Sequence, residues 1–135
     1  MKFTQALIGL PATDYVAVAV AAEAAGFSGV ALSDHIVYPT HLESKYPYTP
    51  DGAPQFEPHW DWPDPWGAVG AMAAATTLLE FVTNVFVLPA REPLMVAKSV
   101  GSAAVLSGDR VWLGIGAGWM REEMEMVGQR FAGRG

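Results

Sequence analysis

AAGFSGVALSDH, at residues 24–35, is the stretch that decides the fold class. Gly26 follows an alanine-rich segment and predicts the end of a helix, because glycine adopts the left-handed conformation at little cost. Residues 29–33 are short and apolar, which is typical of a buried strand. Asp34 and His35 follow that strand directly. The stretch therefore combines a helix end, a buried strand and two polar residues at the carboxyl end of the strand.

The same alternation continues in both directions along the chain. Besides 29–33, short apolar segments bounded by turn residues predict strands at 3–9, 78–88 and 110–115. Segments with helical patterning predict helices at 15–25, 65–75, 93–106 and 120–127. Alternating strands and helices are typical of βαβ units and a parallel sheet. A doubly wound open sheet and a barrel both satisfy this pattern.

The helix boundaries rest on local signals. The side chains of Thr13 and Asp14 are of the kind that cap the free backbone N–H groups at a helix start, so we expect these residues to begin the first helix. Asp64 followed by Pro65 predicts a capped second helix with proline in its first turn. In the third helix, helical spacing predicts one shared apolar face formed by Leu94, Ala97, Gly101, Ala104 and Val105.

A long loop, residues 34–63, is rich in proline and aromatic residues. Proline at this density is incompatible with a helix or a central strand. Loops of this length are usually functional or disordered, and the aromatic content argues against disorder. Trp60, Trp62 and Trp66 form either a wall on which a substrate stacks or anchors that hold the loop, and for Trp66 the anchor is the favoured interpretation.

Composition excludes several classes of protein. The 135-residue chain has a net charge of −6 with scattered basic residues, so a nucleic-acid partner is not expected. No cysteine is present, which excludes disulfides and thiolate chemistry. The histidines at 35, 41 and 59 lack metal-ligand spacing, so no metal is predicted. Neither a signal peptide nor a membrane span is expected, and we predict a cytoplasmic protein.

Polar and small residues gather where the predicted strands end, which is where parallel α/β folds place their sites. His35 is positioned to act as an acid or base, and the alternative is a histidine satisfied in the core. The sequence GIGAG at 114–118 lacks the spacing of a dinucleotide fingerprint because Trp119 follows it. These glycines either let a flat ring approach the backbone or serve packing between elements.

Taken together, several motifs resemble the luciferase-like monooxygenase family, in particular its oxidoreductases that use the deazaflavin coenzyme F420. The matching text is AGFSGVALSDH, YPYTPDG, WPDPW, AATT, VLP, LSGDR and GAGWMREE, in this order along nearly the whole chain. The resemblance implies an α/β fold, a (β/α)8 barrel with its cofactor at the carboxyl-end mouth. It also implies that Trp119 replaces the carboxylate of sugar-phosphate dehydrogenase members, which makes that substrate class unexpected.

The same resemblance implies roles for individual residues. His35 would handle the proton, and Asp34 would border the cofactor ring. Asn84-Val85 would be a non-prolyl cis peptide behind the ring. The remaining cofactor-binding positions would be Gly116, Ala117, Gly118 and Trp119.

A (β/α)8 barrel needs about 250 residues, so residues 1–135 correspond to the first four βα units, the N-terminal half of one barrel domain. The family's phosphate site lies in the other half, so we expect the chain to be inactive by itself. The predicted function is hydride transfer between F420 and a small organic substrate under the 34–63 loop. An FMN-dependent monooxygenase and a non-catalytic assembly module are alternatives. A homo-oligomer is expected, with no membrane partner.

Overall fold

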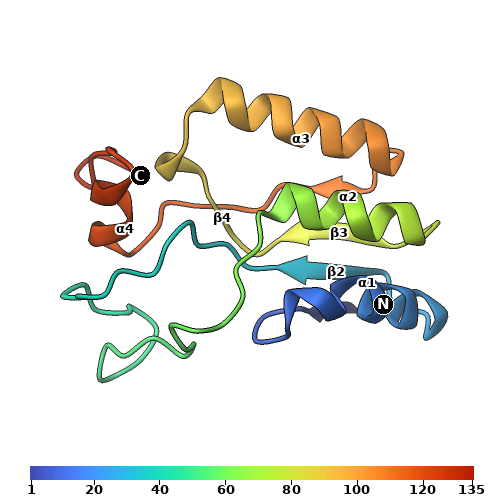
Figure 1. Ribbon diagram of the computed structural model, residues 1–135, viewed down its shortest axis with the longest axis horizontal. Coiled ribbons are helices and arrows are strands. Elements are labelled where there is room, and N and C mark those ends of the chain that lie inside the picture. The colour runs from blue at the N-terminus through green and yellow to red at the C-terminus, as the bar shows by residue number, and fades with distance from the viewer.

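The computed structural model describes all 135 residues and shows strands alternating with helices (Figure 1). The strands are β1 (Thr4–Ala6), β2 (Gly29–Leu32), β3 (Glu80–Thr83), β4 (Phe86–Val87), β5 (Val111–Trp112) and β6 (Ile115–Gly116). The helices are α1 (Tyr15–Ala24), α2 (Pro65–Ala75), α3 (Pro93–Ser107) and α4 (Arg121–Met126). Two short 3-10 turns, η1 (Ala12–Asp14) and η2 (Leu88–Ala90), precede α1 and α3.

The strands follow one another in space as they do along the chain. The main sheet is parallel in the order β1-β2-β3-β5, and β4 pairs in parallel with β6. A doubly wound sheet would reverse its strand order at a switch point. The sequential order therefore confirms the barrel-type arrangement, of which this chain supplies four βα units.

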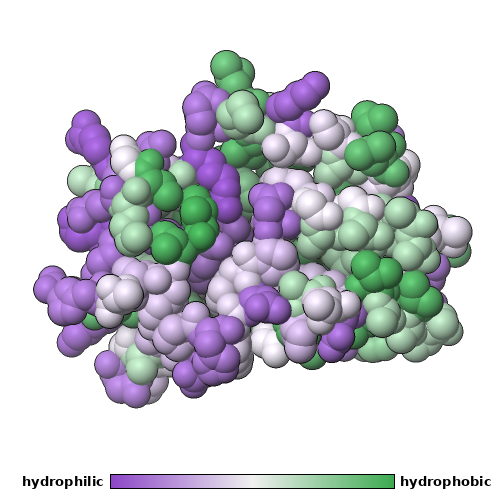
Figure 2. Space-filling model, in the orientation of Figure 1, coloured by the Kyte–Doolittle hydropathy of each residue, from purple (hydrophilic) through white to green (hydrophobic).

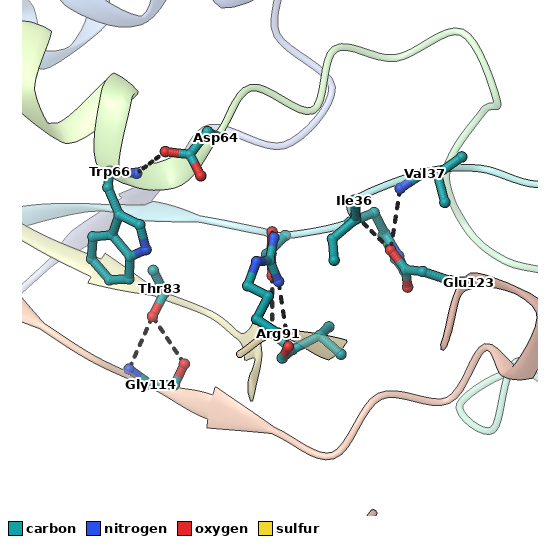
Figure 3. A network of polar contacts seen from close by, with 11 residues as sticks. Ile36, Val37, Asp64, Trp66, Thr83, Arg91, Gly114 and Glu123 are labelled. Carbon is teal, nitrogen blue, oxygen red and sulfur yellow. Dashed lines mark hydrogen bonds and ion pairs between the residues drawn. The ribbon is translucent and has the colours of Figure 1, made fainter. Parts of the chain in front are cut away.

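The third and fourth predicted strands are each broken in two. A cis peptide bond between Asn84 and Val85 separates β3 from β4. Between β5 and β6, the Thr83 hydroxyl donates to the Gly114 carbonyl at 2.9 Å and accepts from its N–H at 3.0 Å. A side chain thus replaces the regular ladder at this point (Figure 3). The prediction of continuous strands over 78–88 and 110–115 is therefore wrong.

The helix boundaries agree with the sequence signals, and only the capping bond predicted at the start of α1 is not formed. The Asp64 carboxylate accepts from the N–H groups of Trp66 and Gly67 at 3.1 and 3.0 Å, as predicted for the start of α2. Gly26 follows α1 with a φ of +80°, as predicted. Asp14, however, is itself helical and makes no capping bond. The predicted cap is wrong because η1 leads directly into α1, so Asp14 already lies inside the turn.

The core lies between the sheet and the three longer helices. Figure 1 shows α1, α2 and α3 on the same side of the sheet. Strand residues such as Val30, Leu32 and Phe81 are buried against them. The register places Ala6, Ala31, Val82 and Trp112 in one row on the opposite face. Trp112 is 58% exposed there, so helices cover one face of this sheet and leave the barrel-interior face open.

The predicted face of α3 needs correction. Helix α3 buries Val96, Ala103 and Ser107, whereas Leu94 and Val105 of the predicted face are 78% and 79% exposed. Apolar residues occur all around this helix, so spacing alone does not select the face that packs.

Glu23 and Arg110 form hydrogen bonds that connect segments near the amino ends of the strands. The Glu23 carboxylate accepts from the N–H groups of Thr77, Leu78 and Leu79, and the Leu78 bond is the main cause of its lowered pKa. The Arg110 guanidinium donates to the carbonyls of Ala73, Thr76 and Leu79. Polar groups at this end of a barrel typically serve stability. None of the helices is both long and apolar enough to span a bilayer.

Candidate functional site

A cavity of about 830 Å³ opens at the carboxyl ends of the strands. The 34–63 loop and α4 lie at this end of the molecule (Figure 1). The cavity is lined by all eight residues that the sequence predicts for the site: Asp34, His35, Asn84, Val85, Gly116, Ala117, Gly118 and Trp119. They come from the ends of strands two, three and four, which explains why residues so far apart in the chain meet here.

The Asp34 carboxylate is held in a buried ion pair. Its two oxygens accept from Arg91 Nη1 at 2.7 Å and Nη2 at 2.8 Å, and Oδ2 also accepts from the Val87 N–H at 2.9 Å. The Arg91 guanidinium lies 4.2 Å from the centroid of the Phe86 ring. Because three donors occupy this carboxylate, it holds the segment after β2 against Val87 of β4 and against Arg91, which follows η2.

His35 pairs with a glutamate that sequence analysis missed. Its Nδ1 lies 3.0 Å from Glu123 Oε2, and the side chains are 9% and 2% exposed. Glu123 Oε1 accepts from the Ile36 N–H at 2.5 Å and the Val37 N–H at 3.4 Å (Figure 3). A carboxylate at Nδ1 places the proton of a neutral imidazole on Nδ1. Nε2 then carries the free lone pair of the ring.

Glu122, the neighbour of Glu123, attaches the long loop to α4. Its Oε1 accepts from the N–H groups of Glu43 at 2.8 Å and Ser44 at 2.9 Å, and the Arg121 N–H donates to Ser44 Oγ at 3.0 Å. Burial raises the pKa of Glu122, but hydrogen bonds from Ser44 and from the backbone outweigh it and lower the pKa to about 2. The carboxylate is therefore ionised under ordinary conditions and clamps the loop.

Asn84 and Val85, where strand three is interrupted, form the part of the cavity lining that we call its floor. The Asn84-Val85 bond is cis, as the family resemblance implies. Asn84 and Val85 are both exposed and line the cavity, and the Ser33 hydroxyl lies 3.4 Å from the Asn84 carbonyl oxygen. This segment therefore contributes one carboxamide residue and one apolar residue to the cavity lining. Such a surface suits a flat ring.

The glycines after strand four pack against strand three. A Cβ at Gly116 would lie 2.5 Å from Val85 Cγ2, and one at Gly118 would lie 2.7 Å from Val87 Cγ1. Gly118 also has a φ of +78°, which favours glycine. Of the two interpretations left open by the sequence, packing thus accounts for both glycines, since neighbouring side chains already fill the space that their missing Cβ atoms leave.

Aromatic rings form much of the remaining wall. Phe56 is buried at their centre, with ring centroids 5.0 Å from His35, 5.2 Å from Trp62 and 6.4 Å from Trp119. Tyr46 lies 5.1 Å from Trp119. The long loop therefore folds over the site through its own aromatic residues.

The three tryptophans considered together in the sequence have different positions. Trp62 lines the cavity and meets the His35 ring edge-on at 4.8 Å. Trp66 is buried in the core against Phe86, the anchor role favoured for it. Trp60 lies over Gly9, where an added Cβ would be 3.2 Å from the indole. Only Trp62 is thus available to a ligand in this cavity.

The partners missed by sequence analysis are Arg91, Glu122 and Glu123. Arg91 was visible as a charge after strand three, and the glutamates as an acidic pair in the first turn of a helix. Neither signal identifies a partner 57 or 88 residues away. No group of three histidine, aspartate or glutamate side chains is arranged to hold a metal.

Comparisons with known proteins agree with this architecture. The model of the luciferase-like monooxygenase family matches residues 4–135. An uncharacterised protein of Mycobacterium tuberculosis is 43% identical over all 135 residues, which span 47% of its length. A second uncharacterised protein of that organism is 31% identical over 76% of this chain and 36% of its own length. The chain thus spans about half the length of these curated relatives or less.

Solved structures share the fold. The oxygenating constituent of 3,6-diketocamphane monooxygenase from Pseudomonas putida, in complex with FMN, has a TM-score of 0.73 at 22% identity and covers 96% of this chain and 33% of that one. An F420-dependent secondary alcohol dehydrogenase, in complex with an F420-acetone adduct, has a TM-score of 0.65 at 23% identity, with coverages of 87% and 32%. One neighbour binds a flavin and the other a deazaflavin.

Proposed function

The chain belongs to the luciferase-like monooxygenase family, and from this premise we propose that it serves an oxidoreductase that transfers a hydride between coenzyme F420 and a small organic substrate. The observation that carries the proposal is the pair of His35 and Glu123 beside the cavity. A histidine oriented through Nδ1 can exchange a proton at Nε2 while a hydride moves at the adjacent carbon.

Proton transfer and hydride transfer are balanced in this scheme. When an alcohol is oxidised, its carbon loses a hydride, its hydroxyl proton passes to His35 Nε2, and a carbonyl forms. F420, when bound, supplies the hydride-accepting ring, as cofactors supply such chemistry generally. In the reverse direction His35 returns the proton to the carbonyl oxygen. Glu123 stabilises the imidazolium in either direction without itself taking the proton.

The residues present fit a flat cofactor. Asn84 and Val85 offer an exposed surface at the cavity floor, and Gly116 and Ala117 add little bulk beside it. The volume of about 830 Å³ lies in the range of small-molecule sites, about 300–1,000 Å³. Asp34 would support this surface from below through Arg91, and Trp119 would close one side. We place residues 1–135 as the first half of the barrel domain, with the 34–63 loop over the substrate.

An FMN-dependent monooxygenase is the second candidate. The solved neighbour with the TM-score of 0.73 holds FMN, and the exposed floor at Asn84 and Val85 suits either ring. A non-catalytic half-barrel is the third. Titration with oxidised F420 and with FMN of a barrel completed with the C-terminal half of the 43% identical mycobacterial relative separates these candidates. We expect F420 to bind more tightly; a preference for FMN would favour the monooxygenase, and binding of neither would favour the assembly module.

Turnover tests the role of His35. In a barrel completed with the C-terminal half of the 43% identical mycobacterial relative, we expect His35→Ala to lower turnover of F420 by about 10²–10⁴-fold. The reason is that no other side chain replaces Nε2 as proton acceptor. Unchanged turnover would make His35 a structural residue.

A further inference from the structure

We propose that the substrate beside His35 is a largely apolar, ring-bearing molecule whose one reacting polar group is a carbonyl or hydroxyl. The proposal rests on the function proposed above, because it names the substrate class of the same site. It is carried by four rings that line the cavity and that we call the aromatic enclosure: Tyr46, Phe56, Trp62 and Trp119.

The aromatic enclosure surrounds the proposed proton acceptor. Trp62 meets the His35 ring edge-on at 4.8 Å, Phe56 lies at 5.0 Å, and Trp119 meets it edge-on at 6.3 Å. Tyr46 extends this wall through its contact with Trp119 at 5.1 Å. A molecule that presents an oxygen to His35 therefore places the atoms next to that oxygen against aromatic surface. Such surface favours apolar and aromatic groups.

The carboxylates near His35 are already occupied. Asp34 accepts from Arg91 and Val87, and Glu123 accepts from the His35 ring and the Ile36 N–H. Glu122 accepts from the Glu43 and Ser44 N–H groups through Oε1, while its buried Oε2 has no hydrogen-bond partner. Sugars are recognised through many hydrogen bonds to their hydroxyls, and buried polar groups without partners weaken binding. A polyhydroxylated substrate would therefore find the Asp34 and Glu123 carboxylates beside His35 already engaged.

Three cations, Lys45, Arg121 and Arg134, also line the cavity. Arg121 and Arg134 stack on the Phe131 ring, with distances of 4.7 and 3.5 Å from guanidinium carbon to centroid. Lys45 is exposed on the long loop. A sugar phosphate could use these cations for its phosphate, which makes glucose 6-phosphate the informative competitor for the proposal.

The experiment compares two probes without any cofactor. Saturation-transfer NMR is recorded on the chain with 2-tetralone, an aromatic bicyclic ketone, and with glucose 6-phosphate. We expect transfer to 2-tetralone and none to the sugar phosphate. Trp119→Ala and Tyr46→Ala, each checked for folding by its amide spectrum, should weaken 2-tetralone binding about tenfold. Trp60→Phe is the matched control, because its ring lies over Gly9 and outside the cavity.

Three results would overturn the proposal: no binding of 2-tetralone, preferential binding of glucose 6-phosphate, or 2-tetralone binding that both alanine variants leave unchanged. The outcome is separable from that of the proposed function. If the completed barrel binds F420 while the chain rejects 2-tetralone, the substrate class alone is refuted. If the chain binds 2-tetralone through the aromatic enclosure but the completed barrel binds neither F420 nor FMN, the proposed function is refuted and the enclosure remains as a ligand site.

Discussion

At the residue scale, the polar groups of the site are held by partners from distant parts of the chain. Glu123 holds His35, and Arg91 holds Asp34, in environments largely closed to water. Buried charges are stable only when paired and hydrogen-bonded. The same pairs that keep the site folded therefore fix the orientation of the side chain proposed to carry the proton.

Glu123→Gln tests whether the carboxylate selects the tautomer of His35. Glutamine keeps the size of the side chain and an oxygen for the Ile36 N–H, but it no longer offers a charged acceptor to Nδ1. We expect the ¹⁵N shifts of the His35 ring to change from the Nδ1–H form to a mixture of tautomers. In the completed barrel, turnover should fall about 10–100-fold, as for other groups that orient a functional histidine.

Glu125→Gln is the matched control for that experiment. Glu125 lies on the same helix, is 58% exposed and reaches only Arg121 at 3.7 Å. Glu125→Gln should leave both the ¹⁵N shifts of the His35 ring and turnover unchanged. A single Nδ1–H tautomer in Glu123→Gln would show that the carboxylate does not select it.

The Asp34–Arg91 pair should dominate stability among the ion pairs. Asp34→Asn leaves a guanidinium that is only 19% exposed without its counter-charge, and we expect a loss of about 3–5 kcal/mol in the free energy of unfolding. Glu80→Gln, which breaks the exposed pair with Lys2, should cost less than about 1 kcal/mol. Urea unfolding followed by circular dichroism measures both. Equal losses would mean that burial does not set the strength of these pairs.

Sequence analysis could locate Asp34 and His35 because their position at a strand end is a local property. It could not find their partners, since Arg91 and Glu123 become neighbours only after the strands pair. The same reason explains why the role of the glycines after strand four could not be predicted. Their spacing was visible in the sequence, but whether a ring or a valine fills the space beside them depends on the register of strand three.

At the element scale, the close approach of strands three and four depends on glycine. A Cβ at Gly114 would overlap the main-chain carbonyl of Thr83, and backbone cannot rotate away as a side chain can. We expect Gly114→Ala to destabilise the chain by about 1–3 kcal/mol, as overpacking does. Gly101→Ala on α3, where nothing lies within 4 Å of the added atom, should instead stabilise it by up to about 1 kcal/mol. Thermal unfolding compares the two, and destabilisation by both would contradict the packing argument.

The attachment of the long loop to α4 should resist acid. The pKa of Glu122 falls from 4.5 to about 2 in the folded protein, so its carboxylate stabilises the folded state above pH 4.5. That contribution decreases as the pH falls and is lost below about pH 2. Carboxyl ¹³C shifts should show Glu122 still ionised at pH 3.5. A midpoint near 4.5 for Glu122 would mean that the bonds from Glu43 and Ser44 are not maintained in solution.

Elements were predicted well where one local signal decides them. The Asp64-Pro65 start of α2 is such a case, and so is Gly26, which follows α1 with a φ of +80°. Predictions failed where a tertiary contact decides. The break near Gly114 needs the Thr83 hydroxyl from another strand, and the buried side of α3 depends on where α2 packs.

At the scale of the whole molecule, the two faces of the sheet are unequal. Helices cover one face, while Trp112 and Ile115 are 58% and 57% exposed near the other. Figure 2 shows hydrophilic surface mostly over the end that carries the long loop and more hydrophobic surface over the helical end. Strands β1 and β5 are the edges of the main sheet. A closed barrel has no such edges.

The open face and free edges lead to a prediction for the chain by itself. Exposed apolar surface and unpaired strand edges favour association, so residues 1–135 should self-associate or be poorly soluble at micromolar concentration. We expect cofactor affinity to be weak as well, because the family resemblance implies a phosphate site in the other half of the barrel. Sedimentation velocity gives the mass, and titration with F420 and FMN gives the affinity.

A pair of variants shows which surface is responsible for association. Trp112→Lys places a charge on the barrel-interior face, and Leu94→Lys places one on the outer side of α3, where Leu94 is 78% exposed. If strands β1 and β5 and the face between them mediate association, Trp112→Lys should lower the mass toward the monomer and Leu94→Lys should not. A soluble monomer that binds F420 or FMN at micromolar affinity would refute the half-barrel interpretation, because it would show that four βα units suffice for the cofactor without a covering half.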